Sequence, residues 1–156
     1  MHSRIFQVST NPIKKEDYTD DSEYYDHWFT RSVADYVIDS AYRDGDLKWL
    51  EDCYESQGIE FGKDDNGEYL IIKSKHKYFE NSFTKFMETI DKISSYTIDD
   101  FINGFFEMWH LKNAYEVKYG FYTDVEDYGL ITIDEFVRKF SENVKFYIGG
   151  TLDYHY

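Results

Sequence analysis

The stretch Lys145–Tyr156, KFYIGGTLDYHY, decides the predicted fold. Aromatic and β-branched residues dominate it, which is typical of a β-strand, and the Gly149-Gly150 pair is expected to bend that strand. At the other end of the chain, Arg4–Ser9 (RIFQVS) alternates apolar and polar residues imperfectly and is predicted to form the first strand. Strands at both ends with helices between them indicate an α+β fold. We expect a small antiparallel or mixed sheet that includes the N- and C-terminal strands and packs with three to four helices.

A hairpin and a helix are predicted in the first half of the chain. Ile59–Ile72 contains two apolar runs around Asn66-Gly67, a dipeptide that tolerates the positive φ angles of tight hairpin turns. Before it, a helix is predicted to begin at Asp44, with apolar residues along one side and Gly58 placed to end it. The segment Ser32–Ile38 fits either a helix or a strand.

Three further helices are predicted in the second half. The first begins near His76, because apolar residues recur there at spacings of three and four, which places them on one helical face. The side chains expected to pack into the core are Phe79, Phe83, Phe86 and Ile90. The second helix is predicted from Thr97 to about Tyr115, and the third begins near Thr132.

The composition predicts one globular domain over residues 1–156. A chain of 156 residues can bury a continuous core, and 42% hydrophobic residues argue against global disorder. Aromatic residues make up 21%; we expect them to fill the core, and an aromatic binding surface is the alternative. No stretch approaches the roughly 18 apolar residues of a membrane span. The N-terminus lacks the apolar run of a secretory signal, so a cytoplasmic protein is expected.

Negative charge is concentrated in one third of the chain. The net charge is -14, and Glu16–Glu68 alone contributes -13, from 17 acids and four bases. Such an excess repels nucleic-acid phosphates and attracts a basic protein surface, whose association it accelerates. A solvated acidic face that only keeps the protein in solution is the alternative.

The acidic segment suggests a non-enzymatic interaction module that binds a basic partner. Small acidic proteins that mimic nucleic acid to inhibit nucleases, and immunity proteins that neutralise nuclease toxins, are similar in size and charge, without a shared motif. Acids alternate with tyrosines here, so that rings supply contact area and carboxylates steer the approach. The residues predicted to bind the partner are Asp17, Asp20, Asp21, Glu23, Tyr24 and Tyr25.

A short pattern occurs twice, thirty-five residues apart: Thr97–Phe105 reads TIDDFINGF and Thr132–Phe140 reads TIDEFVRKF. In each copy the threonine is a good N-cap, because its hydroxyl can accept hydrogen bonds from amides of the first helical turn. Asp100 and Glu135, three residues later, complete or approximate a capping box. The repeat therefore predicts two helix starts.

The second copy overlaps a sequence that resembles an EF-hand calcium loop. With Gly129 at the sixth position, Asp124 is first, Glu126 third, Tyr128 fifth and Glu135 twelfth. The resemblance implies Asp124 and Glu135 as calcium ligands, with Glu126 as a third candidate. However, Glu126 is longer than the usual Asp or Asn, and Tyr128 offers no carboxylate or amide oxygen. We therefore predict a helix start and no cofactor, with a calcium-binding domain as the alternative.

Few residues suggest catalysis. Cys53 is the only cysteine, so no intramolecular disulfide forms, and the neighbouring acid Asp52 is expected to raise the pKa of its thiol. None of the histidines has metal-ligand spacing, and no glycine loop suited to phosphate is present. No catalytic residue is predicted. An unrecognised enzyme with a site assembled from His110 and His155 is the remaining alternative.

Overall fold

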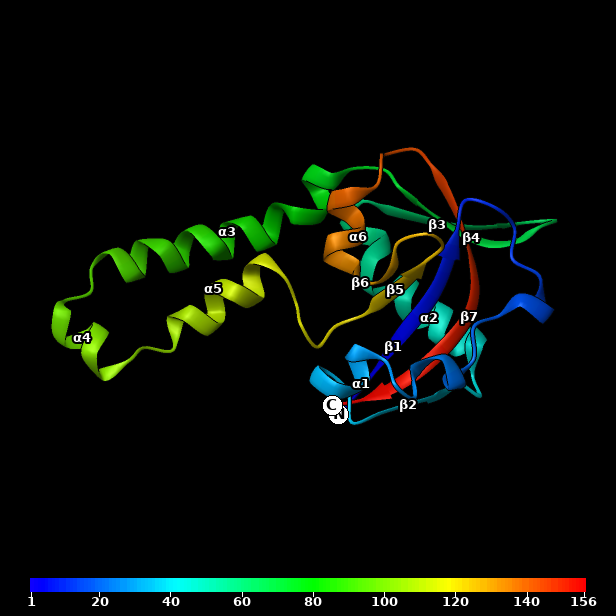
Figure 1. The fold of residues 1–156 in the computed structure, drawn as a ribbon. Helices are drawn as coiled ribbons and strands as arrows, with labels where there is room; N and C mark the ends of the chain where they lie inside the picture. Colours follow the sequence, from blue (N-terminus) through cyan, green and yellow to red (C-terminus); the bar gives the residue numbers. More distant parts are fainter.

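The computed structural model describes residues 1–156 and contains a seven-stranded sheet (Figure 1). The strands follow the order β3-β4-β7-β1-β5-β6, and β2 pairs with β7 beside this path. Their bounds are β1 His2–Ser9, β2 Tyr36–Asp39, β3 Ile59–Asp64, β4 Gly67–Ile72, β5 Tyr122–Val125, β6 Gly129–Thr132 and β7 Lys145–His155. β1 and β5 run parallel, whereas the other pairs are antiparallel. The predicted α+β class and the mixed sheet with both terminal strands are confirmed.

β7 is the central strand, since it pairs with β1, β2 and β4. Val8 lies opposite Ile148 and Phe6 opposite Thr151, so β7 carries one extra residue at the Gly149-Gly150 pair. Side chains alternate between the two faces of a strand, and an extra residue therefore sends the following side chains to the other face. The predicted bend is thus a β-bulge, which lets one strand contribute to the apolar clusters on both faces.

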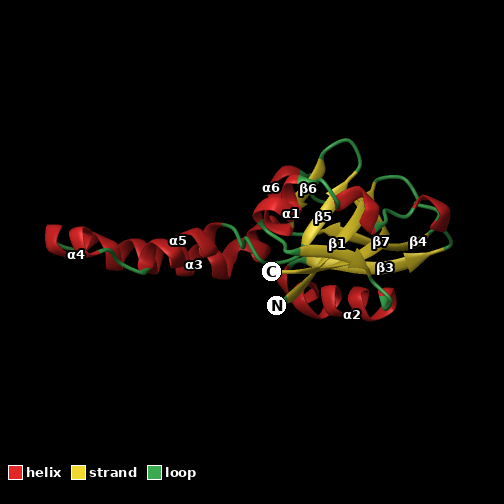
Figure 2. Ribbon diagram, turned by 60° about the horizontal axis from the view of Figure 1, so that its bottom comes forward, coloured by secondary structure: helices red, strands yellow, loops and turns green.

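Two apolar clusters cover the sheet. The larger includes Leu50 of α2 and Phe136 of α6, and the smaller includes Phe29 of α1. Figure 2 shows α2 below the sheet and α1 above it. The helices are α1 Trp28–Ser32, α2 Arg43–Tyr54, α3 Lys75–Ser94, α4 Ile98–Asn103, α5 Glu107–Tyr115 and α6 Ile133–Lys139, with 3₁₀ helices at Lys15–Asp17, Asp21–Tyr24 and Glu55–Gln57. Six α-helices exceed the three to four predicted.

Several local predictions are confirmed. The β3–β4 hairpin forms as predicted, but its turn residues are Asp65 and Asn66, and Gly67, with a φ of 126°, is the first residue of β4 and pairs with Asp64. Gly58, with a φ of 89°, follows α2 and its short 3₁₀ extension, as expected of a glycine that ends a helix. The ambiguous segment Ser32–Ile38 contains most of β2.

Helices α3, α4 and α5 form a projection of residues 75–115, here called the arm; the remaining residues are the body (Figures 1 and 2). α3 has 20 residues, which corresponds to a length of about 30 Å. α5 packs along α3, and α4 lies at the tip. The predicted continuous helix from Thr97 to Tyr115 is wrong, because Gly104 adopts a φ of 76° and separates α4 from α5.

The predicted burial of the apolar stripe of α3 is also wrong in part. Phe83 is 63% exposed and Ile90 is exposed as well, whereas Phe79 and Phe86 are half-buried. Only the beginning of α3 reaches the core, where Tyr78 is buried and Phe79 packs against the larger apolar cluster. Periodicity correctly indicated an amphipathic helix, but its apolar side faces α5 and solvent instead of the sheet.

Candidate interaction surface

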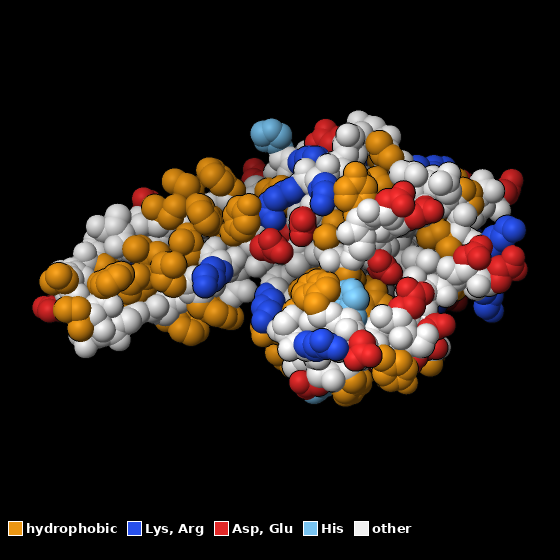
Figure 3. Space-filling view, viewed as in Figure 1, with side chains coloured by type: hydrophobic (Ala, Val, Ile, Leu, Met, Phe, Trp, Pro, Cys, Tyr) orange, Lys and Arg blue, Asp and Glu red, His pale blue; other side chains and the backbone are white.

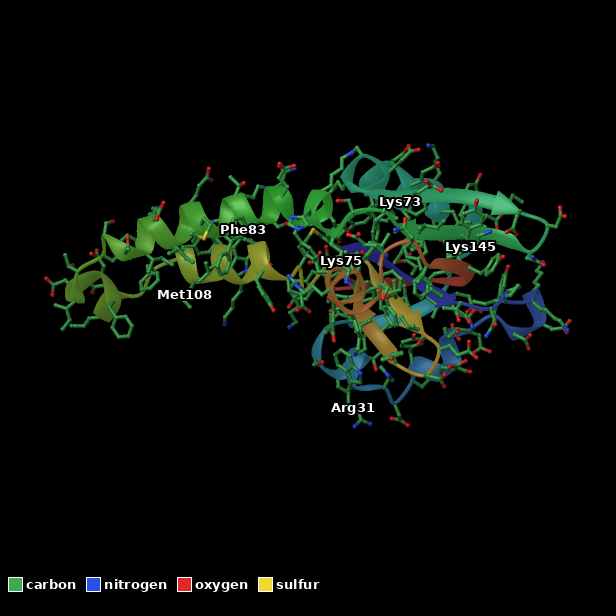
Figure 4. The ribbon with its side chains drawn as sticks, turned by 90° about the horizontal axis from the view of Figure 1, so that it is seen from above. Arg31, Lys73, Lys75, Phe83, Met108 and Lys145 are labelled. Atoms are coloured by element: carbon green, nitrogen blue, oxygen red, sulfur yellow. The ribbon has the colours of Figure 1, made fainter.

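The long helix of the arm exposes an apolar row. Phe83, Met87 and Ile90 are spaced by four and three residues, which places them on one face of α3, and all three are exposed. Figure 3 shows hydrophobic side chains gathered along the arm, and Figure 4 labels Phe83 on α3 and Met108 on α5. The arm therefore presents an apolar surface formed by both of its long helices.

The tip of the arm exposes all three large apolar side chains of α4. Ile98, Phe101 and Ile102 are exposed, Phe101 by 74%. The helix begins with a capping box: the Asp100 amide donates to the Thr97 hydroxyl (3.4 Å), and the Thr97 amide donates to the Asp100 carboxylate (2.8 Å). The predicted capping box is confirmed. Local hydrogen bonds thus hold this short helix in place and leave its apolar side chains in solvent.

The returning helix adds two adjacent exposed rings. Phe106 and Trp109 are stacked with centroids 5.2 Å apart, and both are exposed. Met108 and Tyr115 are exposed on the same helix. Aromatic residues and methionine are enriched at protein–protein interfaces because they offer large contact areas with few rotatable bonds.

Contacts between the helices hold the arm together. The rings of Tyr96 and Phe105 pack edge to face, with centroids 5.1 Å apart. Lys92 of α3 forms an ion pair with Glu107 of α5. Hydrogen bonds from Lys92 and then Tyr96 lower the pKa of Glu107 to about 2, so this carboxylate is charged at neutral pH. The two long helices are thus linked near the tip by both apolar and ionic contacts.

Helix α6 of the body clamps the base of the arm. Asp134 accepts hydrogen bonds from the Tyr78 hydroxyl of α3 (2.8 Å) and from the Val117 amide just after α5 (2.8 Å). The Arg138 guanidinium lies 4.1 Å from the ring centroid of Tyr115 and 4.7 Å from that of a phenylalanine of α3. It also donates a hydrogen bond to the Tyr115 carbonyl. The side chains of Asp134 and Arg138 therefore hold both α3 and the end of α5.

The exposed apolar area of the arm is large. Ten bulky side chains contribute to it: Phe83, Met87, Ile90, Ile98, Phe101, Ile102, Phe106, Met108, Trp109 and Tyr115. With about 200 Å² for a complete large side chain, their exposed fractions amount to roughly 1,000 Å². This total is distributed over the different sides of the arm, whereas the largest contiguous apolar patch on a typical monomer is about 300–600 Å². This surface is what the sequence analysis missed; its only signal was the aromatic content.

Most of the predicted partner-binding residues lie at the surface of the body. The exposed or half-exposed members are Asp17, Asp20, Asp21, Glu23 and Tyr25. Tyr24 is a wrong prediction: it is 3% exposed, belongs to the smaller apolar cluster, and donates its hydroxyl hydrogen bond to Asp124 over 3.2 Å. The acids beside Tyr24 in the sequence suggested an exposed side chain, whereas its ring is buried.

The acids of this segment crowd one another. Burial, followed by the charges of Asp124 and Asp20, raises the pKa of Glu23 above its ordinary value. An open cleft of about 880 Å³ lies beside them, lined by Asp20, Asp39, Asp44, Lys15 and Arg43 among others. Arg43 is engaged by the Gly149 carbonyl and by Glu68, so its charge is already partly neutralised. The charged side chains that line the cleft are thus three aspartates and two basic residues.

The calcium alternative gains no ligand cluster from the structure. Residues 122–132 form the β5–β6 hairpin instead of a loop between two helices. Asp124 accepts hydrogen bonds from side chains of residues 19 and 24, Glu126 accepts one from Ser9, and Glu135 lies in the first turn of α6. No three His, Cys, Asp or Glu side chains are placed to hold a metal ion. The predicted helix start is confirmed, because the Thr132 hydroxyl accepts from the amide three residues later, at 3.1 Å.

The other candidates for chemistry are separated in the fold. His110 contacts aromatic rings of the arm, whereas His155 lies at the end of β7 with Nδ1 2.9 Å from Asp35, so a site built from both histidines is wrong. Burial and then Asp52 raise the pKa of the Cys53 thiol, as predicted. None of the helices combines the length and the apolar character needed to cross a membrane.

No family profile, curated protein or solved structure matches this chain. The surface of the molecule presents two candidate sites for a partner: the apolar arm and the acidic segment beside the cleft.

Proposed function

We propose that this protein is a non-enzymatic protein–protein interaction module whose main contact surface is the arm. The supporting observation is the roughly 1,000 Å² of apolar side-chain surface that the arm exposes. Water contact with so much apolar area is unfavourable by about 25 cal/mol per Å², and a protein partner would remove it. The location we propose for this interaction is the cytoplasm.

The base of the arm supports this proposal. Asp134 and Arg138 hold α3 and the end of α5, and the ion pair between Lys92 and Glu107 links these two helices near the tip. A surface that is already rigid loses less conformational entropy when it binds, which favours affinity. The arm is therefore suited to binding without prior folding.

The proposal is tested by removing apolar side chains from the arm. We would replace Phe83, Phe101 and Trp109 with serine in the full chain and use the tagged protein to capture binding proteins from host extract. The expected result is that proteins retained by the unmodified chain, further copies of itself included, are lost with the triple variant. Apolar rings at the centre of an interface carry most of its binding energy.

A matched control removes exposed rings from the body. Trp28 and Tyr128 are 50% and 55% exposed, and their replacement with serine should leave the captured proteins unchanged. Thermal melts of both variants establish that the fold persists. If the arm variant retains the same proteins as the unmodified chain, the arm is not the contact surface.

The acidic segment supports a second candidate function, the binding of a basic partner. Asp17, Asp20, Asp21 and Glu23 lie near one another in sequence. Burial and then the charges of Asp124 and Asp20 raise the pKa of Glu23, and a cationic surface would offset the repulsion between these charges. A nuclease neutralised by an acidic inhibitor or immunity-type protein is the kind of partner this charge suits.

Neutralising the segment tests this second candidate. The four acids would be changed to Asn or Gln; Asn at position 20 can still cap the 3₁₀ helix whose first turn Asp20 now caps. Association with a basic protein captured from the extract should slow at low salt and change little at high salt, while the melting temperature stays the same or rises. Unchanged association at low salt would remove the steering role, and a collapsed melting transition would assign these acids to structure.

A further inference from the structure

We infer that the partner of the arm is a second copy of this chain, whose own arm packs antiparallel against it in a four-helix bundle. This inference rests on the proposed function, because it names the occupant of the same apolar surface. The area, the charge distribution and the two ends of the arm support it.

The area suits a stable dimer. The exposed apolar side chains of the arm total roughly 1,000 Å² per copy over all sides of its helices, compared with approximately 800 Å² per partner in a standard interface. Helices α3 and α5 already pack side by side as two helices of a bundle, and the exposed residues Phe83, Met87 and Ile90 of α3 recur at helical spacing. A second layer of the same kind would cover these residues with ridges and grooves of matching dimensions.

The charge distribution selects the arm as the place where two copies can meet. Residues 75–115 contain five lysines and six acids, whereas the rest of the chain contains 12 bases and 25 acids. Contact between two bodies would therefore bring like charges together, and contact between two arms would not. Since α3 has 20 residues, an antiparallel overlap keeps the bodies about 30 Å apart, several times the roughly 8 Å screening length at physiological salt.

The tip and the base of the arm are complementary. At the base, an open cleft of about 370 Å³ is lined by apolar side chains that include Phe86 and Tyr115, and by Lys112 and Lys118. At the tip, the exposed ring of Phe101 follows the acids Asp99 and Asp100. An antiparallel dimer places each tip beside the base of the other copy, so the ring of Phe101 can enter the cleft. Asp99 points to the other side of α4, so its charge lies near the lysines and attracts them without direct pairing.

The one acid that lines this cleft does not oppose the arrangement. Glu116 accepts a hydrogen bond from the Thr132 hydroxyl (3.0 Å) and lies 3.9 Å from Arg138. Lys112 and Lys118 have no ion pair within the chain, and neither has Asp99. Two-fold symmetry makes the tip-to-base contact twice, and it closes the assembly at two copies.

The test measures the mass of the full chain in solution. Sedimentation velocity across micromolar to submillimolar concentrations should give twice the 18.8 kDa chain mass at the upper end. Phe101→Ser should weaken dimerisation about tenfold or more, because the change acts at two symmetric contacts. Asp99→Lys should weaken it by a smaller factor of about two to five, because it reverses an exposed charge near the lysines. Adding Lys112→Asp and Lys118→Asp to Asp99→Lys should restore dimerisation, since opposite charges lie near each other again.

The body variant Tyr128→Ser, which also removes an exposed ring, serves as the control and should dimerise like the unmodified chain. A chain that stays monomeric at all concentrations, or a dimer that ignores Phe101→Ser and the charge reversals, overturns the inference. If the chain is monomeric but still captures another protein through the arm, only the identity of the partner is wrong. If it is monomeric and captures nothing, the proposed function fails as well.

Discussion

Phe83→Ala and Phe136→Ala make a decisive pair, since they remove the same side chain from the arm and from the core. Complete burial of a phenylalanine contributes about 1.5–3 kcal/mol. Phe83 is 63% exposed, so its removal should reduce the free energy of unfolding by less than about 1 kcal/mol. Phe136 is fully buried, with ring centroids of Phe140 and Phe146 each 5.0 Å away. Its removal should cost about 3–5 kcal/mol, including the cavity that remains.

Urea unfolding followed by far-UV circular dichroism measures both values. The melts should be repeated over a range of protein concentrations, because dimerisation through the arm adds a concentration-dependent stabilisation that Phe83→Ala would remove. At the lowest concentration only the intrinsic effect remains. An unchanged dependence of the free energy on urea shows that the unfolding reaction is the same in each protein.

A loss of more than about 3 kcal/mol in the free energy of unfolding for Phe83→Ala, at every protein concentration, would contradict the exposed position of this ring. That result would mean that α3 packs against the body and that the arm does not project in solution. A cost below about 1 kcal/mol for Phe136→Ala would contradict the position of the larger apolar cluster instead.

Thr132→Ala should destabilise the fold by about 1 kcal/mol through loss of an N-cap, and urea melts with chelator or added calcium should give the same value. Asp46→Asn should cost about 3 kcal/mol in the same assay, because Asp46 is 3% exposed and the charge it pairs with Arg4 would be lost. Glu68→Gln should reduce the pH dependence of stability: a hydrogen bond from Lys63, aided by other contacts, lowers the folded-state pKa of Glu68 from 4.5 to about 2. The stabilisation of the fold by the Glu68 carboxylate is therefore complete above pH 4.5 and is lost as the pH falls toward 2. Unfolding midpoints measured across this range should change less in the variant than in the unmodified chain.

The sequence by itself determined the features that depend on neighbouring residues. The N-caps at Thr97 and Thr132, the hairpin of β3 and β4 and the helix end at Gly58 were all predictable. Each depends on hydrogen bonds or φ angles within a few residues, which the local residue types fix. The two terminal strands were predictable for a similar reason, because aromatic and β-branched side chains favour extended backbone.

Only the tertiary structure decided what covers each apolar side chain. The pairing of β1 with β5 joins residues more than 110 positions apart, and the sequence around Asp124 gave no local sign of it. Tyr24 lies among acids in sequence but beneath them in space. The stripe of α3 has the period of a core helix, yet α5 covers one side of it and nothing within the chain covers Phe83. Periodicity indicates which residues share a face of a helix. Contacts between distant segments decide which element covers that face. For the arm, we propose that the covering element belongs to a second molecule.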